Sequence, residues 1–215
     1  TGVYKRLELM DEYLNEFDAA PETTQDSRIE WQPKKFAEPK HEIEYYPAGA
    51  DQPETHSVMM NWLLNDRPFS ALEELTLGIL DHLLMGTTSS ILRKTLMESG
   101  LGEAITGDGV SDELLQATFS VGLKGIQKDD VPAVEQLVME TLQKAATEGF
   151  EDDDIAASVN TVEFMMREFN TGSFPKGLSF MLGSMSNWLY ERSPTEALKF
   201  EEPLAALKKE MATSG

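Results

Sequence analysis

Histidines and acidic side chains are the residues of this chain that could bind or activate a metal ion. The 215 residues include three histidines, His41, His56 and His82, and no cysteine. Zinc sites on helices commonly place two histidines on one face, four residues apart. No two of these histidines have that spacing, and no thiolate is available for a structural zinc site. The sequence therefore predicts no metal site and no catalytic residue in this segment.

The other polar features near these residues have local structural explanations. His82 follows Asp81 in an apolar stretch, which favours a partly buried imidazole satisfied by a local hydrogen bond. The acidic run at 151–154 lacks the alternating oxygen ligands and the central glycine of a calcium loop. We expect this run to supply the N-cap and the favourable charge of a helix's first turn.

Motifs for nucleophilic or nucleotide chemistry are also missing. The chain has no G-x-S-x-G sequence and no cysteine. Gly107 and Gly109 lack the strand-loop-helix setting of a nucleotide-binding fingerprint, so we predict a turn there.

The loop at 170–175 contains the residues best suited to a role beyond packing. Gly172 permits unusual backbone angles, and the side chains of Asn170 and Ser173 can cap helix ends. Two interpretations remain open: a motif that joins two helices, or a contact with substrate or a neighbouring domain. Arg167 is the nearest charged contributor to such a contact. The candidate substrate-binding residues are therefore Arg167, Asn170 and Ser173.

Charge is the strongest compositional signal. There are 38 acidic and 18 basic side chains, which gives a formal net charge of -20. Such a surface repels nucleic acid, and it raises the local concentration and association rate of cationic peptides. Solubility is the alternative explanation for this charge.

Hydrophobic periodicity predicts an order of strands and helices without strict β-α-β alternation. The predicted helices are 3–18, 68–85, 89–99, 129–148, 152–169, 176–190 and 194–209. The predicted strands are 41–46, 55–65 and 114–125, with short segments at 29–32 and 102–106. Residues 55–65 carry apolar side chains on both faces, so we expect cover on both sides for part of that strand. The sequence predicts an α+β domain, a largely antiparallel sheet with helices packed on one face.

The stretch 80–102 predicts two helices joined by a turn. Gly86 fits a left-handed helix end, and a Thr or Ser hydroxyl from 87–90 fits the next N-cap. Charged residues interrupt every apolar run before it reaches the roughly 20 residues that span a bilayer, so we expect no membrane role. We expect the eleven methionines mainly to fill the core, with a minority facing a substrate chamber.

Four blocks of this sequence resemble one family. They are MNWLLND (60–66), LDHLLMGTTSSILRKTLMESGLG (80–102), DELLQATFSVGLKGI (112–126) and NTGSFPKGL (170–178). Together they resemble the second, non-catalytic domain of the organellar presequence proteases, zinc peptidases of the pitrilysin or inverzincin clan. The clan's H-x-x-E-H motif belongs to the preceding domain and is absent here.

The resemblance implies the domain organisation. Residues 1–39 would be the terminal helix and linker of the preceding catalytic domain, and 40–215 the non-catalytic α+β domain. The N-terminus lacks the apolar core of a signal peptide and the arginine-rich character of a transit peptide, so we expect a piece of a longer polypeptide.

The resemblance also implies function. The parent would be a zinc metalloendopeptidase that degrades cleaved mitochondrial or chloroplast targeting peptides and other unstructured peptides, with zinc held outside this segment. This segment would be inactive alone, would form part of the chamber wall, and would have the remaining domains as partners. The location would be the mitochondrial matrix or the chloroplast stroma. The alternatives are a free-standing acidic peptide-binding adaptor, or a non-catalytic subunit of a processing peptidase.

Overall fold

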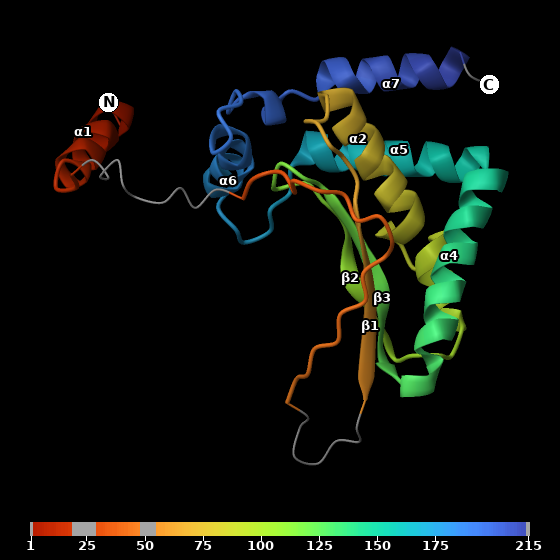
Figure 1. Ribbon diagram of the computed structural model, residues 1–215. Coiled ribbons are helices and arrows are strands. Elements are labelled where there is room, and N and C mark those ends of the chain that lie inside the picture. The colour runs from red at the N-terminus through yellow and green to blue at the C-terminus, as the bar shows by residue number, and fades with distance from the viewer. Residues whose placement is uncertain (1, 19–28, 48–54, 214–215) are drawn as a thin grey trace.

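A three-stranded antiparallel sheet lies at the centre of this chain. The computed structural model describes residues 2–18, 29–47 and 55–213. The strands are β1 (His56–Leu63), β2 (Ala104–Ser111) and β3 (Thr118–Ile126), in the spatial order β1-β3-β2 (Figure 1). The predicted α+β class with an antiparallel sheet is confirmed, because the helices do not alternate regularly with these strands.

Helices form most of the remaining described chain. The α-helices are α1 (Gly2–Leu14), α2 (Ala71–Asp81), α3 (Ile91–Glu98), α4 (Val131–Glu148), α5 (Asp152–Glu168), α6 (Lys176–Trp188) and α7 (Glu201–Thr213). Shorter elements are the π-helical turn η1 (His82–Gly86) and the 3₁₀ turns η2 (Lys128–Asp130) and η3 (Glu196–Leu198). Figure 1 shows α2, α4 and α5 on the same side of the sheet.

The central strand β3 is buried along most of its length. It pairs with β1 along one edge and with β2 along the other. Val121 and Leu123 are fully buried. Between them, a Cβ atom at Gly122 would lie 1.9 Å from the carbonyl oxygen of Val58 in β1. Glycine at this position therefore permits the close approach of the two strands.

Strand β1 alternates between a core face and an open face. Val58, Met60 and Trp62 pack against the main core, whereas Met59 and Leu63 are exposed. The prediction that other elements cover both faces of this strand is wrong for the described chain, because α2 and α4 lie on one side of the sheet.

Two apolar clusters hold the helices to the sheet and to one another. The main cluster joins the sheet to η1, α3 and α4, and its buried members are Leu84, Met85, Leu92, Leu96, Phe119, Val121, Leu123, Ile126, Val134, Val138 and Ala145. A smaller cluster joins α2, α5 and α7 through Ile79, Val159 and Leu207. Val134 and Val138 of α4 and Val159 of α5 therefore lie in the apolar stripes that pack in the core.

The break after α2 differs from the predicted left-handed end at Gly86. The helix widens into η1, and the chain leaves it at Thr87 in an extended conformation. Gly86 is not among the positive-φ glycines, and a Cβ atom there would lie 2.6 Å from the ring of His82. Ser90 occupies the N-cap position of α3, but its hydroxyl donates to the carbonyl of His82 at 2.9 Å and so joins the two helices instead.

The N-terminal third contains fewer strands than predicted. Residues 29–32 and 41–46 are not strands, and Ile43 and Tyr45 are exposed because no described strand pairs with them. Helix α1 ends at Leu14, and its apolar side chains are exposed. The predicted loop at 47–53 lies mostly outside the described residues, as do positions 19–28 of the predicted linker.

The residues around β2 and α7 also differ from prediction. Strand β2 extends to Ser111, beyond the predicted 102–106, because Gly107 and Gly109 adopt positive φ inside an irregularity of its register with β3. These glycines lie in a β-bulge and not in the predicted turn. Helix α7 starts at Glu201, not at 194, because Pro203 has no N–H and fits only a first turn.

One stretch of the described chain, Ala71–Glu98, is long and apolar enough by length and composition to cross a membrane. Residues 87–90 interrupt it as a helix, and Leu84, Leu92 and Leu96 within it belong to the main core. Core helices commonly have the same composition.

Candidate functional site

The α5–α6 loop carries the candidates Asn170 and Ser173. Helix α5 is followed by Phe169, whose φ of 41° is left-handed. The Asn170 carboxamide accepts a hydrogen bond from the Gly172 N–H at 3.0 Å, and the Thr171 hydroxyl donates to the carbonyl of Phe174 at 2.6 Å. Asn170 thus stabilises its own turn, and Ser173 is exposed on it. The sequence identified this loop correctly as a break between helices.

Arg167, the third candidate, is engaged on the α5 surface. Its guanidinium pairs with Glu163 at 2.8 Å and lies 5.8 Å from the centre of the Phe200 ring. Lys208 also pairs with Glu163, at 2.5 Å. Hydrogen bonds from Lys208 and Arg167 lower the pKa of Glu163. The structure therefore places Arg167 in an ion-pair network that joins α5 to α7, and does not bring it together with Asn170 and Ser173.

His82 and the acidic run at 151–154 have structural positions at helix α5. His82 Nδ1 lies 3.0 Å from the Ser158 hydroxyl of α5, so its hydrogen bond is between helices and not local as predicted. Glu151 occupies the N-cap position of α5 without a side-chain capping bond, and the acidic residues after it lie in the first turn. Within residues 2–18, 29–47 and 55–213, no three His, Cys, Asp or Glu side chains gather in a way that could hold a metal ion.

A cleft of about 360 Å³ lies between the helices and strand β2. One wall comes from Asp81, Met85 and Gly86 at the end of α2 and in η1, together with Arg93 and Met97 of α3. The other wall is strand β2, through Ala104, Ile105, Gly107, Asp108 and Gly109. We call this the β2 cleft. It combines apolar side chains, two carboxylates and one guanidinium.

Asp81 is the half-buried polar group of the β2 cleft. Its Oδ1 accepts a hydrogen bond from the backbone N–H of Val110 at 3.0 Å, at the edge of the sheet. Burial raises the pKa of Asp81, although the bond from Val110 opposes this. Gly109 has φ +70°, and a Cβ atom there would lie 2.2 Å from Asp81 Oδ1. The bulge in β2 and the carboxylate therefore fit each other closely.

Sequence reasoning did not identify the β2 cleft. Asp81 was visible only as a charge inside an apolar helix, and Gly107 and Gly109 only as turn residues. The sequence signal that could have indicated the cleft was a carboxylate on the core side of a helix, because a buried acid needs a hydrogen-bond donor from another element. That donor comes from β2, 29 residues further along the chain.

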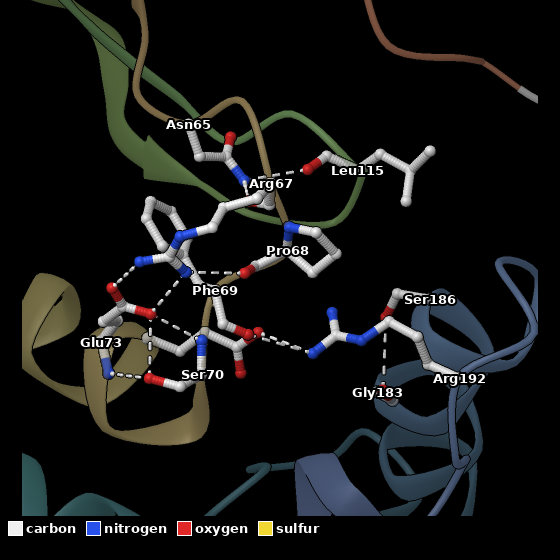
Figure 2. A network of polar contacts seen from close by, with 11 residues as sticks. Asn65, Arg67, Pro68, Phe69, Ser70, Glu73, Leu115, Gly183, Ser186 and Arg192 are labelled. Atoms are coloured by element: carbon white, nitrogen blue, oxygen red, sulfur yellow. Dashed lines mark hydrogen bonds and ion pairs between the residues drawn. The ribbon is translucent and has the colours of Figure 1, made fainter.

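A polar junction joins the end of β1 to the start of α2 (Figure 2). Arg67 makes two hydrogen bonds to the carboxylate of Glu73, at 2.5 and 3.0 Å. Ser70 and Glu73 form a reciprocal capping box at the start of α2. Arg192, which follows α6, reaches Glu74 at 3.2 Å and so connects this helix start to the C-terminal helices. The junction has a structural role, because each charged group has its partner.

The pH dependence of stability should reflect Glu73. Hydrogen bonds from Arg67 and Ser70 lower the pKa of its carboxylate from 4.5 to about 2. The folded state therefore favours the ionised form of Glu73. The resulting contribution to the free energy of unfolding is complete above pH 4.5 and is lost as the pH falls toward 2. In urea unfolding between pH 5 and 2.5, Glu73→Gln should show a shallower loss of stability than the parent chain. Glu98→Gln, at an exposed carboxylate of α3, is the control, and equal slopes for the parent and Glu73→Gln would contradict the assignment.

Comparisons with known proteins agree with this arrangement. Residues 5–162 match the family model described as the peptidase M16 inactive domain. Presequence protease 1, chloroplastic/mitochondrial, of Arabidopsis thaliana is 51% identical over 98% of this chain. Protein HypA of Clostridium perfringens is 30% identical over 98% of the chain, and the mitochondrial presequence protease of Mus musculus is 34% identical over 71%.

The matches cover only a fraction of these relatives. The chain spans 19% of the Arabidopsis protein, 21% of the Clostridium protein and 14% of the mouse protein. Most of each relative's length therefore has no counterpart in this chain.

Proposed function

Because this chain belongs to the peptidase M16 family, as the inactive domain of that family, we propose that it is a structural segment of a longer zinc metalloendopeptidase. This proposal rests on the 51% identity, over 98% of this chain, to a presequence protease. The described residues offer no set of ligands that fits zinc, so no step of peptide hydrolysis is assigned to them. The catalytic metal and its ligands would lie in another part of the polypeptide.

The proposed division of the chain is 1–39 and 40–215. Residues 1–39 would contain the last helix of the preceding domain and its linker, and 40–215 the non-catalytic domain. The exposed apolar side chains of α1 support this division, because a helix with such a face normally packs against another domain. Residues 29–35 also contact the 40–215 region. The Gln32 N–H donates to Gln116 Oε1 at 2.6 Å, and Lys35 forms an ion pair with Asp66 at 2.7 Å.

The proposed substrates are cationic targeting peptides and other short unstructured peptides. A formal net charge of -20 supports this choice, because a negative field attracts positive peptides. The segment would form part of the wall that encloses the peptide, and its partners would be the remaining domains of the same polypeptide. The proposed location is the mitochondrial matrix or the chloroplast stroma.

Asn170 and Ser173 of the α5–α6 loop, and Arg167 on the α5 surface, remain the proposed contacts with substrate or a neighbouring domain. Their exposure and the self-contained turn of Asn170 support a loop that is available for contact. The Arg167 network with Glu163 would orient one side of that contact.

The test of this proposal uses the longer polypeptide. A polypeptide that contains this chain and its neighbouring regions should cleave an arginine-rich peptide of about twenty residues, should leave a folded protein intact, and should lose activity with a zinc chelator. Mass spectrometry of the products would measure the cleavage. If the chain is instead encoded as a complete short protein that binds the peptide without cleaving it, the adaptor alternative replaces this proposal.

A further inference from the structure

The β2 cleft combines the groups that recognise a long cationic side chain, and we propose that it binds an arginine or lysine side chain of an unstructured peptide. The proposed function supplies the source of such peptides, so the inference rests on it in that respect. The binding chemistry itself depends only on the residues of the cleft.

The apolar residues of the cleft fit the stem of such a side chain. Met85, Met97 and Ile105 line the cleft, and Met97 is 46% exposed at its surface. Arginine and lysine bury their methylene groups against apolar surface while the charged end stays near polar groups. Methionine adapts its shape to such stems because its side chain is unbranched and polarizable.

The carboxylates fit the charged end. Asp81 uses Oδ1 to accept the Val110 N–H, and a carboxylate has further acceptor positions on its second oxygen. Asp108 adds a second acidic side chain from the β2 wall. Attraction between unlike charges is stronger at a half-buried position than in open solvent, so a guanidinium or ammonium group would be held better here than at an exposed acid.

Arg93 sets a limit on this attraction. Its guanidinium lines the α3 wall of the same cleft and repels a cationic ligand. With both aspartates ionised, the three charged side chains still leave the cleft negative. Removing the charge of Arg93 should therefore strengthen binding of a basic side chain, whereas removing the charge of Asp81 should weaken it.

The size of the cleft favours one side chain over a larger partner. Ligand pockets in proteins usually range from about 300 to 1,000 Å³, and the β2 cleft, at about 360 Å³, is near the lower limit. An extended peptide would place a single basic residue in it and leave the rest of the peptide outside.

The test follows the methyl signals of the methionines by NMR in the 215-residue chain. The probe is an N-acetylated ten-residue peptide with three arginines, and the control peptide has citrulline, which is neutral and nearly isosteric, in place of each arginine. Acetylation removes the terminal ammonium group, and the same peptide with a free N-terminus tests that second source of positive charge. The signals of Met85 and Met97 should shift with saturation, whereas those of Met139 and Met165, exposed on α4 and α5, should not.

The variants separate the cleft from the general charge of the chain. Asp81→Asn keeps an acceptor for the Val110 N–H and should weaken binding about tenfold, because a charged hydrogen bond is lost. Arg93→Gln should strengthen binding about threefold, in line with one partly screened repulsion. Asp129→Asn removes an exposed charge outside the cleft and should change affinity less than twofold. The urea midpoint of Asp81→Asn should not fall below that of the parent, because burial already disfavours the ionised acid.

The outcomes are distinct. Equal binding of the arginine and citrulline peptides, shifts of all exposed methionines, or equal effects of Asp81→Asn and Asp129→Asn would overturn the inference. If Asp81→Asn does not fold, Asp108→Asn takes its place, and unchanged binding by that variant overturns the inference equally. Cleavage by the longer polypeptide without binding in the cleft would reject only this inference, and binding without cleavage would reject only the proposed function.

Discussion

Gly122→Ala is expected to lower the free energy of unfolding by about 3 kcal/mol or more, and so to leave much of the chain unfolded. A Cβ atom at this position would lie 1.9 Å from the Val58 carbonyl oxygen and 2.8 Å from the Met59 Cα atom. These are backbone atoms of a paired strand, so no side chain can rotate away to make room. The measurement is urea unfolding followed by far-ultraviolet circular dichroism.

Gly78→Ala is the matched control for this substitution. Gly78 lies within α2, and a Cβ atom there would meet nothing within 4 Å. Alanine is favoured over glycine in a helix, so stability should rise by up to about 1 kcal/mol. If Gly122→Ala unfolds at the same urea concentration as the parent, the close pairing of β1 and β3 is incorrect.

Leu96→Ala should lower the free energy of unfolding by about 2–5 kcal/mol. Leu96 is 0% exposed and lies on α3, within the cluster that joins this helix to the sheet. The truncated side chain would leave a cavity that rigid neighbours cannot fill completely. Thermal and urea unfolding would both report the change.

Leu80→Ala provides the comparison with an exposed leucine. Leu80 is 39% exposed on α2, so its truncation should cost less than about 1 kcal/mol. Similar losses for Leu80→Ala and Leu96→Ala would show that α3 does not pack on the sheet as described.

Elements with a clear apolar period were predictable from sequence. Helices α4 and α5, predicted from their periodicity, end where Gly149 and Phe169 leave the helical conformation, and Val134, Val138 and Val159 on their apolar stripes are buried. Periodicity succeeds in such helices because each buries one stripe against a core whose position does not depend on distant pairing.

Pairing between distant segments limited the remaining predictions. Residues 41–46 have the alternation of a strand, but a strand exists only where a neighbour pairs with it. The bulge at Gly107 and Gly109 lies against the Asp81 carboxylate, which accepts a hydrogen bond from Val110 and belongs to another element. These features follow from long-range contacts that local sequence patterns do not contain.

Sequence patterns located one of the two candidate sites and missed the other. The α5–α6 loop was recognisable from Asn170 and Pro175, because loop residues carry local turn signals. The β2 cleft was not recognisable, because its two walls are brought together only by folding. The surroundings of Arg167 also could not be predicted from the sequence, because its partner Phe200 lies on a later segment of the chain.

We expect this chain to be scaffold for chemistry located elsewhere in a longer peptidase. The direct test is to purify residues 1–215, titrate them with zinc by calorimetry, and incubate the zinc-treated chain with an arginine-rich peptide. We expect no stoichiometric zinc binding and no cleavage products by mass spectrometry, while the longer polypeptide should cleave the peptide under the same conditions. Saturable binding of one zinc ion, together with chelator-sensitive cleavage by this chain alone, would contradict this expectation.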